Sequence, residues 1–188
     1  MIMKTLVTKL TDNMKILLRI MALCFFCLQL HAQQQVFVET ESFASTGGWV
    51  IDQQSYAVMG SSYLMAHGMG RPVKDAETTV NFPAKGKYHV WVRTKDWAPF
   101  PKGPGKFVVS VNDVPLKPIF GESGDDAWKW YDGGEVNITA EQVKLSLKDL
   151  TGFNGRGDAL LFTNTPGFTP PNEPSALMAF RRKLLHLT

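Results

Sequence analysis

The run KYHVWVRTK, Lys87 to Lys95, decides the fold class of this protein. Apolar side chains return at every second position, which is the pattern of a β-strand with one buried face. Trp91 falls on the opposite face between cationic side chains, so we expect it either at the surface or beneath a second layer of structure. The predicted core face carries Tyr88, Val90, Val92 and Thr94.

Eight further short runs of this kind occupy residues 33–165, where helical periodicity is nearly absent. Turn-forming Gly, Pro, Asn and Asp residues separate them. Nine strands at this spacing predict an all-β protein, an antiparallel jelly-roll β-sandwich in residues 33–165. The other eight runs are VFVETESF (36–43), GWVIDQQ (48–54), SYLMAH (62–67), ETTVNFP (77–83), KFVVSVN (106–112), VNIT (136–139), VKLSLKDL (143–150) and DALLFT (158–163).

Two of the connections have the composition of tight turns. TTVNFPAKGKYHVWV is interpreted as a β-hairpin with Pro83 to Gly86 in its turn. SVNDVPL predicts a second tight turn at Asn112 and Asp113.

Residues 1–32 have the pattern of a secretory signal peptide. Four cationic side chains precede the apolar run IMALCFFCLQL, Ile20 to Leu30, and the small residue Ala32 stands at the expected cleavage point. The apolar run is too short for a membrane span, and no span is expected in the mature chain. Both cysteines, Cys24 and Cys27, belong to this segment, so no disulfide is expected after cleavage. We expect an exported protein of a bacterial periplasm or cell surface.

The mature chain is electrically neutral. The whole sequence has 20 Lys and Arg against 17 Asp and Glu, and residues 1–32 hold four of the basic residues and one of the acidic ones. The remainder therefore has 16 basic and 16 acidic residues. A neutral chain offers no general attraction for a phosphate backbone, which argues against nucleic acid or anionic lipid as a partner.

The C-terminal part changes character. Residues 166–174 contain four prolines and are predicted to be a linker. Residues 175–188 are predicted to form a short helix with Asn172 as a plausible N-cap. Arg181 and its two basic neighbours suit the negative end of the helix dipole. The apolar stripe of this helix carries Leu177, Phe180, Leu184 and Leu187.

Residues suited to catalysis are few. No cysteine remains in the mature chain to act as a nucleophile, and only His67 and His89 lie within the predicted sandwich. The segment HGMGRP, His67 to Pro72, lacks the third glycine and the strand-to-helix setting of a dinucleotide loop. We therefore expect a non-catalytic module.

The tryptophans offer a better candidate for a binding site. Flat aromatic faces stack on sugar rings, and loops on a rigid sandwich are where binding sites usually lie. Trp97 lies in the loop DWAPFPKGPG, where surface contact is more natural than a core role. For Trp128 and Trp130, packing is an equally good interpretation. The predicted contact surface for a glycan consists of Trp97, Trp128, Trp130 and Tyr131.

The stretch VFVETESF raises a question of charge. Read as a strand, it places Glu39 and Glu41 between Phe37 and Phe43 on one face. Burying an unpaired carboxylate is very costly. Either that face is open to water, or something positive meets the glutamates.

Several segments resemble calcium-containing jelly-roll carbohydrate-binding modules. VFVETESF is similar to their opening strand, YHVWVR to an inner strand, WKW to a tryptophan-rich segment, and GFNGRGDALLF to their closing turn and strand. The resemblance implies a structural calcium ion held by Glu39 or Glu41 and by Asp158. Arg156 departs from the pattern, because an arginine so near Asp158 can replace the metal as counter-charge. The glutamates are therefore expected to face solvent, to meet Arg156 or another cation, or to help hold calcium.

A closer resemblance covers nearly all of the mature chain. GGWVIDQQ, GSSYLMAHGMGRPVKDA, YHVWVRTKDW, DLTGFNGRGDALLFT and FTPPNEP are similar to the N-terminal module of secreted FAD-dependent oxidoreductases from Bacteroidota-type bacteria. The Gly-rich flavin fingerprint of those enzymes is missing here, so their redox activity is not implied. The leading hypothesis is an exported carbohydrate-binding-like accessory module. The alternative is a structural domain that docks onto a flavin domain through the DWAPFPKGPG loop and the C-terminal helix.

Overall fold

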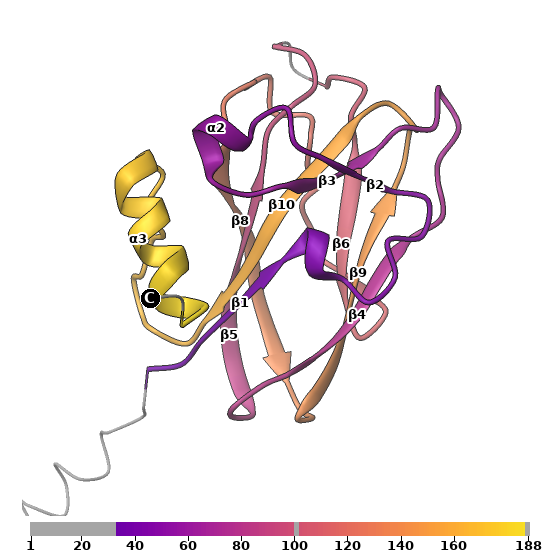
Figure 1. Cartoon of the computed structure of the whole chain (residues 1–188). Coiled ribbons are helices and arrows are strands. Elements are labelled where there is room, and N and C mark those ends of the chain that lie inside the picture. Colours follow the sequence, from indigo (N-terminus) through magenta and orange to yellow (C-terminus); the bar gives the residue numbers. More distant parts are fainter. Residues whose placement is uncertain (1–32, 100–101, 187–188) are drawn as a thin grey trace, which may run out of the picture. The chain divides into compact units, whose positions relative to one another are not determined.

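A computed structural model describes residues 33–99 and 102–186 of the chain (Figure 1). The predicted signal peptide lies outside the described residues, as does Leu187. Two antiparallel sheets pack face to face, and the prediction of an all-β, jelly-roll β-sandwich is confirmed. Each of the nine predicted runs overlaps a strand, and a two-residue strand, Val114–Pro115, is added after the sixth strand. The strand that includes VNIT begins at Lys129, seven residues before that run.

The first sheet has six strands in the order β2-β3-β10-β5-β8, and β1 pairs with β10 beside this path. The second has four strands in the order β4-β9-β6-β7. In the first sheet the strands are β1 (Gln35–Glu39), β2 (Val50–Asp52), β3 (Tyr63–Ala66), β5 (Gly86–Thr94), β8 (Lys129–Ile138) and β10 (Gly155–Thr163). In the second they are β4 (Ala76–Asn81), β6 (Phe107–Val111), β7 (Val114–Pro115) and β9 (Gln142–Asp149).

The main core lies between the sheets and follows the period-two pattern of the sequence. The face of β5 predicted to be buried is buried along its whole length. Leu145 and Leu147 of β9 meet it from the second sheet, and both are fully buried. Burial of such side chains stabilises the fold by about 1.5–3 kcal/mol each.

The reversal between β4 and β5 is not the hairpin that the sequence predicts. β4 pairs with β9 in the second sheet, whereas β5 pairs with β8 and β10 in the first. Phe82 ends the run from β4 and is buried in the core between the sheets. The segment from Pro83 to Gly86 therefore carries the chain from one sheet to the other, and the hairpin prediction was wrong.

The predicted turn at Asn112 and Asp113 is confirmed. β6 and β7 pair on either side of it, with Val111 opposite Val114. Asn112 and Asp113 have φ angles of 49° and 63°, in the left-handed region. Two such residues in a row form the connection whose twist matches that of the flanking strands.

The first strand ends earlier than predicted. β1 stops at Glu39, and Thr40–Ser42 form a single 3-10 turn, η1. The hydroxyl of Thr40 is buried and donates to the carbonyl of Gly157 at 2.5 Å. Strand alternation therefore does not extend to Glu41, and Phe43 packs into the main core.

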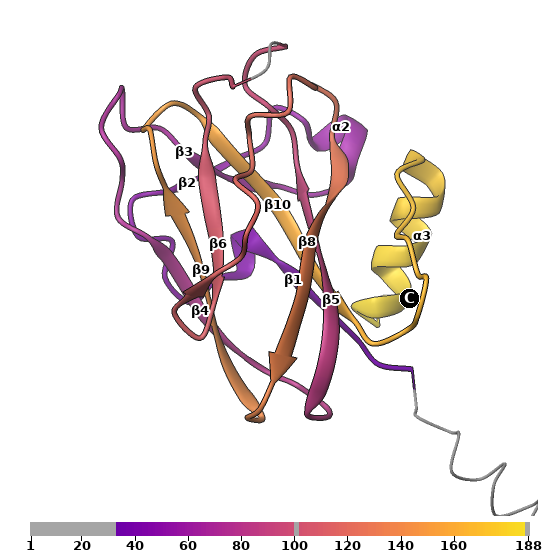
Figure 2. The same ribbon diagram turned by 180° about the vertical axis from the view of Figure 1, so that it is seen from behind.

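A helical layer lies outside the first sheet. α3 (Pro174–Leu184) packs beside β1, and Figures 1 and 2 both show it next to that sheet. Its apolar stripe, with Leu177 at the centre, forms a second cluster with Trp130 and Leu161, and Trp91 packs against this cluster. Trp91 thus lies beneath a second layer, which was one of its two expected environments. A short helix, α2 (Tyr56–Met59), precedes β3.

The N-cap of α3 is Glu173, so the expectation for Asn172 was wrong. The Glu173 carboxylate accepts the amide N–H groups of Ser175 and Ala176 at 3.0 and 3.1 Å. These contacts satisfy amides that the first helical turn leaves without partners. Asn172 instead accepts the main-chain N–H of Trp130 at 2.9 Å, which ties the linker to β8.

Candidate functional site

Three connections of the sandwich lie together at one of its ends. The loops after β5 and β9 meet there with the loop that leads into β8, because Thr94 stands opposite Lys129 and Phe107 stands opposite Asp149. We call the surface the loop-end patch. It consists of Asp96, Trp97, Ser123, Tyr131 and Phe153.

Asp96 is the polar anchor of the patch. Its carboxylate is fully buried, and Oδ2 accepts the Ser123 hydroxyl at 3.0 Å and the main-chain N–H of Gly124. The Ser123 hydroxyl also lies 3.0 Å from the phenol oxygen of Tyr131. Asp96 Oδ1 is buried without a hydrogen-bond partner among the described residues. The loop into β8 is thereby fixed against the loop that carries Trp97.

Trp97 and Phe153 are the aromatic part of the patch. Their side chains are 46% and 45% exposed, which is unusual for residues of this size. Gly105 lies between the two loops, since a Cβ added there would be 3.3 Å from Trp97 Cβ and 3.0 Å from the Phe153 carbonyl. A side chain at position 105 would separate the loops, so glycine allows the loop that carries Trp97 to approach the backbone of the loop that carries Phe153.

His67 and Asn154 lie at the rim of this end. His67 Nδ1 is 2.7 Å from Asn154 Oδ1, which places an imidazole and an amide beside Phe153. The patch and this rim together bring half-exposed aromatic side chains near hydroxyl, amide and imidazole groups, which are suited to stacking and hydrogen bonding with a sugar.

The predicted contact residues divide into two groups. Trp97 and Tyr131 belong to the loop-end patch and are linked through Asp96 and Ser123. Trp128 and Trp130 instead contact the outer face of the first sheet, which is turned away from the second sheet. Sequence reasoning missed Asp96, Ser123 and Phe153, and for Phe153 the only signal was a large apolar residue inside the turn GFNG.

Trp130 is a packing residue rather than a surface residue. It is 6% exposed, meets Phe37 edge-on at 6.2 Å between ring centroids, and donates its indole N–H to the Pro171 carbonyl at 3.2 Å. Trp128 is half-buried, with its ring 4.8 Å from that of Tyr63 and the Arg93 guanidinium 5.7 Å from its centroid.

The carboxylate of Glu39 in the first strand is paired with an arginine, but this arginine is not Arg156. Arg181 of α3 donates to Glu39 Oε1 at 3.0 Å and to both oxygens of Asp158 at 3.1 Å. Arg93 donates to Asp158 Oδ2 at 2.9 Å. Arg156, the expected candidate, donates to the main-chain carbonyl of Asn154 instead. The Asp158 carboxylate, which is fully buried, thus lies between two guanidinium groups.

Glu41 stands at the margin of this cluster. Burial raises the pKa of its carboxyl to about 8, and the negative charges of Glu39 and Asp158 add to that effect. Its own backbone amide and the charge of Arg181 act in the opposite direction. Oε2 of Glu41 is buried without a hydrogen-bond partner among the described residues. At neutral pH this carboxyl holds its proton.

The residues implied for calcium do not fit a calcium ion. Both oxygens of Asp158 already accept hydrogen bonds from arginine, and Oδ1 also accepts the Ser61 hydroxyl at 3.0 Å. Ca²⁺ needs six to eight oxygen ligands with free lone pairs, and two guanidinium charges repel it. Within the described ranges, no group of three or more His, Cys, Asp or Glu side chains is placed to hold a metal.

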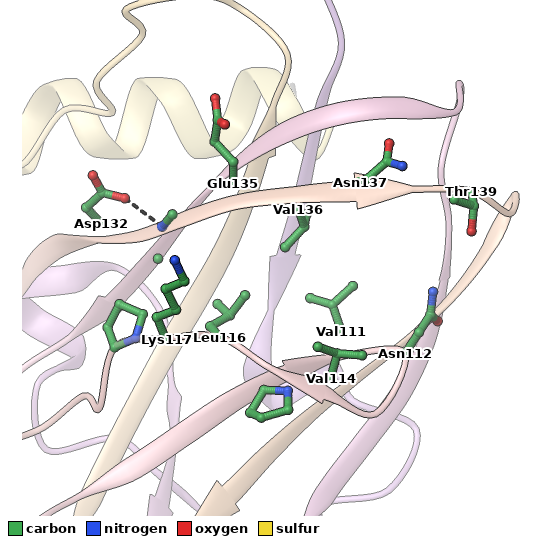
Figure 3. Close-up of a pocket in the computed structure, with 14 residues that line it drawn as sticks. Val111, Asn112, Val114, Leu116, Lys117, Asp132, Glu135, Val136, Asn137 and Thr139 are labelled. Atoms are coloured by element: carbon green, nitrogen blue, oxygen red, sulfur yellow. Dashed lines mark hydrogen bonds between the residues drawn. The ribbon is translucent and has the colours of Figure 1, made fainter.

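A groove of about 860 Å³ runs between the two sheets at the edge where β7 and β8 lie (Figure 3). In Figure 3, Val136 of β8 points toward Val111 and Leu116, whereas Glu135 points away from them. The floor is therefore aliphatic. None of the described residues that line the groove is aromatic, so it offers no stacking surface for a sugar ring.

No helix among the described residues is long and apolar enough to cross a membrane.

No protein-family model matches the sequence, and no curated protein matches it. Solved structures do match the fold. A family 35 carbohydrate-binding module from Clostridium thermocellum superimposes with a TM-score of 0.54 at 18% identity, over 70% of this chain and 98% of that module. The CBM36-1 domain of a multidomain xylanase from the hindgut metagenome of Trinervitermes trinervoides gives 0.51 at 15% identity, over 72% and 100%.

A β-(1,4)-mannanase of Podospora anserina that contains a CBM35 gives a TM-score of 0.55 at 17% identity, over 73% of this chain and 30% of the mannanase chain. At these identities the likeness concerns the fold. The chain has the jelly-roll β-sandwich fold of carbohydrate-binding modules.

Proposed function

We propose that this protein is an exported, non-catalytic module that binds glycans at the loop-end patch. The observation that carries the proposal is the exposed indole of Trp97, held at the loop-rich end of a carbohydrate-binding-module fold beside an ordered polar network. Exposed apolar surface with polar groups at its rim is typical of ligand-binding sites. Stacking on a sugar ring accounts for that exposure.

The polar network supports the same proposal. Ser123 and Tyr131 hydroxyl groups are both donors and acceptors, as are the hydroxyl groups of a sugar. Their positions are fixed by Asp96, whose buried carboxylate accepts from both Ser123 and Gly124. A pre-ordered site loses little conformational entropy on binding. The proposed contacts come from Trp97, Ser123 and Tyr131, which are neutral groups, so we expect binding to depend weakly on salt.

The test is titration of the chain from Gln33 onward against a panel of soluble polysaccharides and a glycan array. Trp97→Ala is expected to weaken binding about tenfold or more, which corresponds to ~1.4 kcal/mol. The melting temperature should not fall, because this side chain contributes little to the core. Tyr56→Ala is the matched control, since Tyr56 is 56% exposed but belongs to α2. Binding that is equal in the two variants, or absent for every glycan, would rule out this site.

The alternative proposal is a docking domain for a flavin-dependent oxidoreductase. Of the two expected contact elements, the loop with Trp97 is exposed, but the stripe of α3 is already packed on the first sheet. Docking would therefore depend on the loop. Analytical ultracentrifugation with a purified flavin domain from such an enzyme distinguishes the two proposals. Complex formation that Trp97→Ala abolishes, without any glycan binding, would favour docking.

A further inference from the structure

The geometry points to Arg181 as a built-in counter-ion: its guanidinium takes the place of a bound cation between the first and last strands, so the module folds without a metal. The inference concerns the folding of the module and is independent of the proposed glycan site.

The guanidinium of Arg181 contacts two carboxylates at once. Nη1 and Nη2 lie 3.1 Å from the two oxygens of Asp158, and Nη2 is also 3.0 Å from Glu39 Oε1. Nε donates to the same Glu39 oxygen at 3.3 Å. A planar guanidinium suits this task because its donors are fixed in the geometry of a carboxylate. One side chain thus bridges β1 and β10, as a cation bound between the two strands would.

The charges of this cluster are buried and balanced. Asp158 is fully buried, and Arg181 is 5% exposed. Arg93, 2% exposed, supplies the second positive charge on Asp158. Although burial disfavours the charged form of Arg181, the charges of Asp158 and Glu39 raise its pKa. Asp158, Glu39, Arg181 and Arg93 therefore each have an opposite charge as partner, which is the condition under which buried ions persist.

The C-terminal helix supplies the bridging arginine. Arg181 comes from α3, outside the β-sandwich, and its partner Glu39 is 142 residues earlier in the sequence. The helix is therefore part of the folded module and completes its charge balance. Arg93 of this cluster also lies against the ring of Trp128 at the outer face of the first sheet.

The first experiment is thermal unfolding of the unaltered protein, purified once with a chelator and once with millimolar calcium chloride. A metal that binds the folded state raises the melting temperature, and its removal lowers it. The expected difference between the two samples is within about 1 °C. A melting temperature that is several degrees higher in the calcium sample than in the chelator sample would overturn the inference.

The second experiment removes the positive charge of Arg181. Arg181→Met keeps much of the side-chain volume and is expected to lower the melting temperature by at least about 8 °C, because it leaves buried Asp158 with one partner fewer and Glu39 with none. Arg182→Met, on the exposed side of the same helix, is the control and should change it by less than about 2 °C.

A third set of variants keeps the test valid if Arg181→Met does not fold. Arg181→Lys retains the charge but loses the forked geometry, and should be intermediate. Adding Glu39→Gln to Arg181→Met should recover part of the loss, because the unpaired carboxylate is removed as well. Equal melting temperatures for Arg181→Met and Arg182→Met would show that the guanidinium is not the counter-ion.

Discussion

The ring of Phe82 stands edge-on to that of Tyr88, with 5.2 Å between their centroids and an interplanar angle of 89°. The two residues lie six positions apart on either side of the chain reversal between β4 and β5, yet their strands belong to different sheets. Phe82 also meets Phe162 of β10 at 5.1 Å. The reversal is thus held by aromatic packing inside the sandwich instead of by hairpin pairing.

Phe82→Ala should lower the free energy of unfolding by about 3–5 kcal/mol, since it leaves a cavity between the sheets. Urea unfolding with an unchanged m-value would measure it. Lys85→Ala, on the exposed part of the same reversal, is the control and should stay within about 0.5 kcal/mol. A loss below about 1 kcal/mol for Phe82→Ala would contradict its core role.

Trp130→Ala should destabilise the protein by about 3–5 kcal/mol, because it removes the centre of the contact between α3 and the first sheet. Trp130→Phe should cost less, about 1–2 kcal/mol, since the ring remains and the hydrogen bond to Pro171 is lost. Faster proteolysis within residues 164–173 would report release of the helix in the alanine variant. If instead Trp130→Ala left stability intact and reduced glycan binding, the predicted surface role of Trp130 would be restored.

Glu41 should make stability fall as the pH rises. Its pKa is about 8 in the folded state against 4.5 for the ordinary group, so the folded state binds more protons between these values. Stability gained from this group is therefore fully present below about pH 4.5 and is lost as pH increases toward 8. The slope from one such group is at most about 1.4 kcal/mol per pH unit.

Glu41→Gln should flatten this slope and raise the melting temperature at pH 8.5 relative to the unaltered protein, with little difference at pH 5. Glu135→Gln is the control, because that carboxylate is exposed and paired with Lys87. Parallel pH profiles for the unaltered protein and Glu41→Gln would show that the carboxyl titrates normally.

Asp113→Gly should stabilise the turn between β6 and β7, whereas Asp113→Ala should not. At φ 63° a Cβ is strained, and Asp tolerates this conformation better than Ala. Both variants lose the exposed ion pair with Lys144. The difference between them therefore isolates the backbone effect, which we expect to be about 1 kcal/mol in favour of Gly. Equal stabilities in urea unfolding would contradict a strained turn.

Local pattern in the sequence was sufficient for much of the fold. Period-two alternation identified the buried face of β5, because a strand with one face in solvent must alternate. It located only the last residues of β8, the longest strand, through the run VNIT. The pair Asn112 and Asp113 specified its turn, since few residues accept two left-handed conformations in a row. The apolar stripe predicted the C-terminal helix, and the surroundings of Trp97 predicted its exposure.

Tertiary structure decided the pairings that local pattern does not contain. The alternation of side chains along β5 is the same whichever sheet the strand joins. The inward position of Phe82 decides which sheet that is. From the sequence Trp130 can be interpreted as a contact residue, whereas in the folded chain α3 covers it. Arg181 looked like a helix-dipole residue, and Arg156 looked like the neighbour of the glutamates. The sequence by itself determined the strands, the helix and an exposed Trp97, because these depend on neighbours a few residues away. Only the folded chain decided that Glu39 and Asp158 meet Arg181, because a buried charge is neutralised by whichever opposite charge packing brings within about 3 Å.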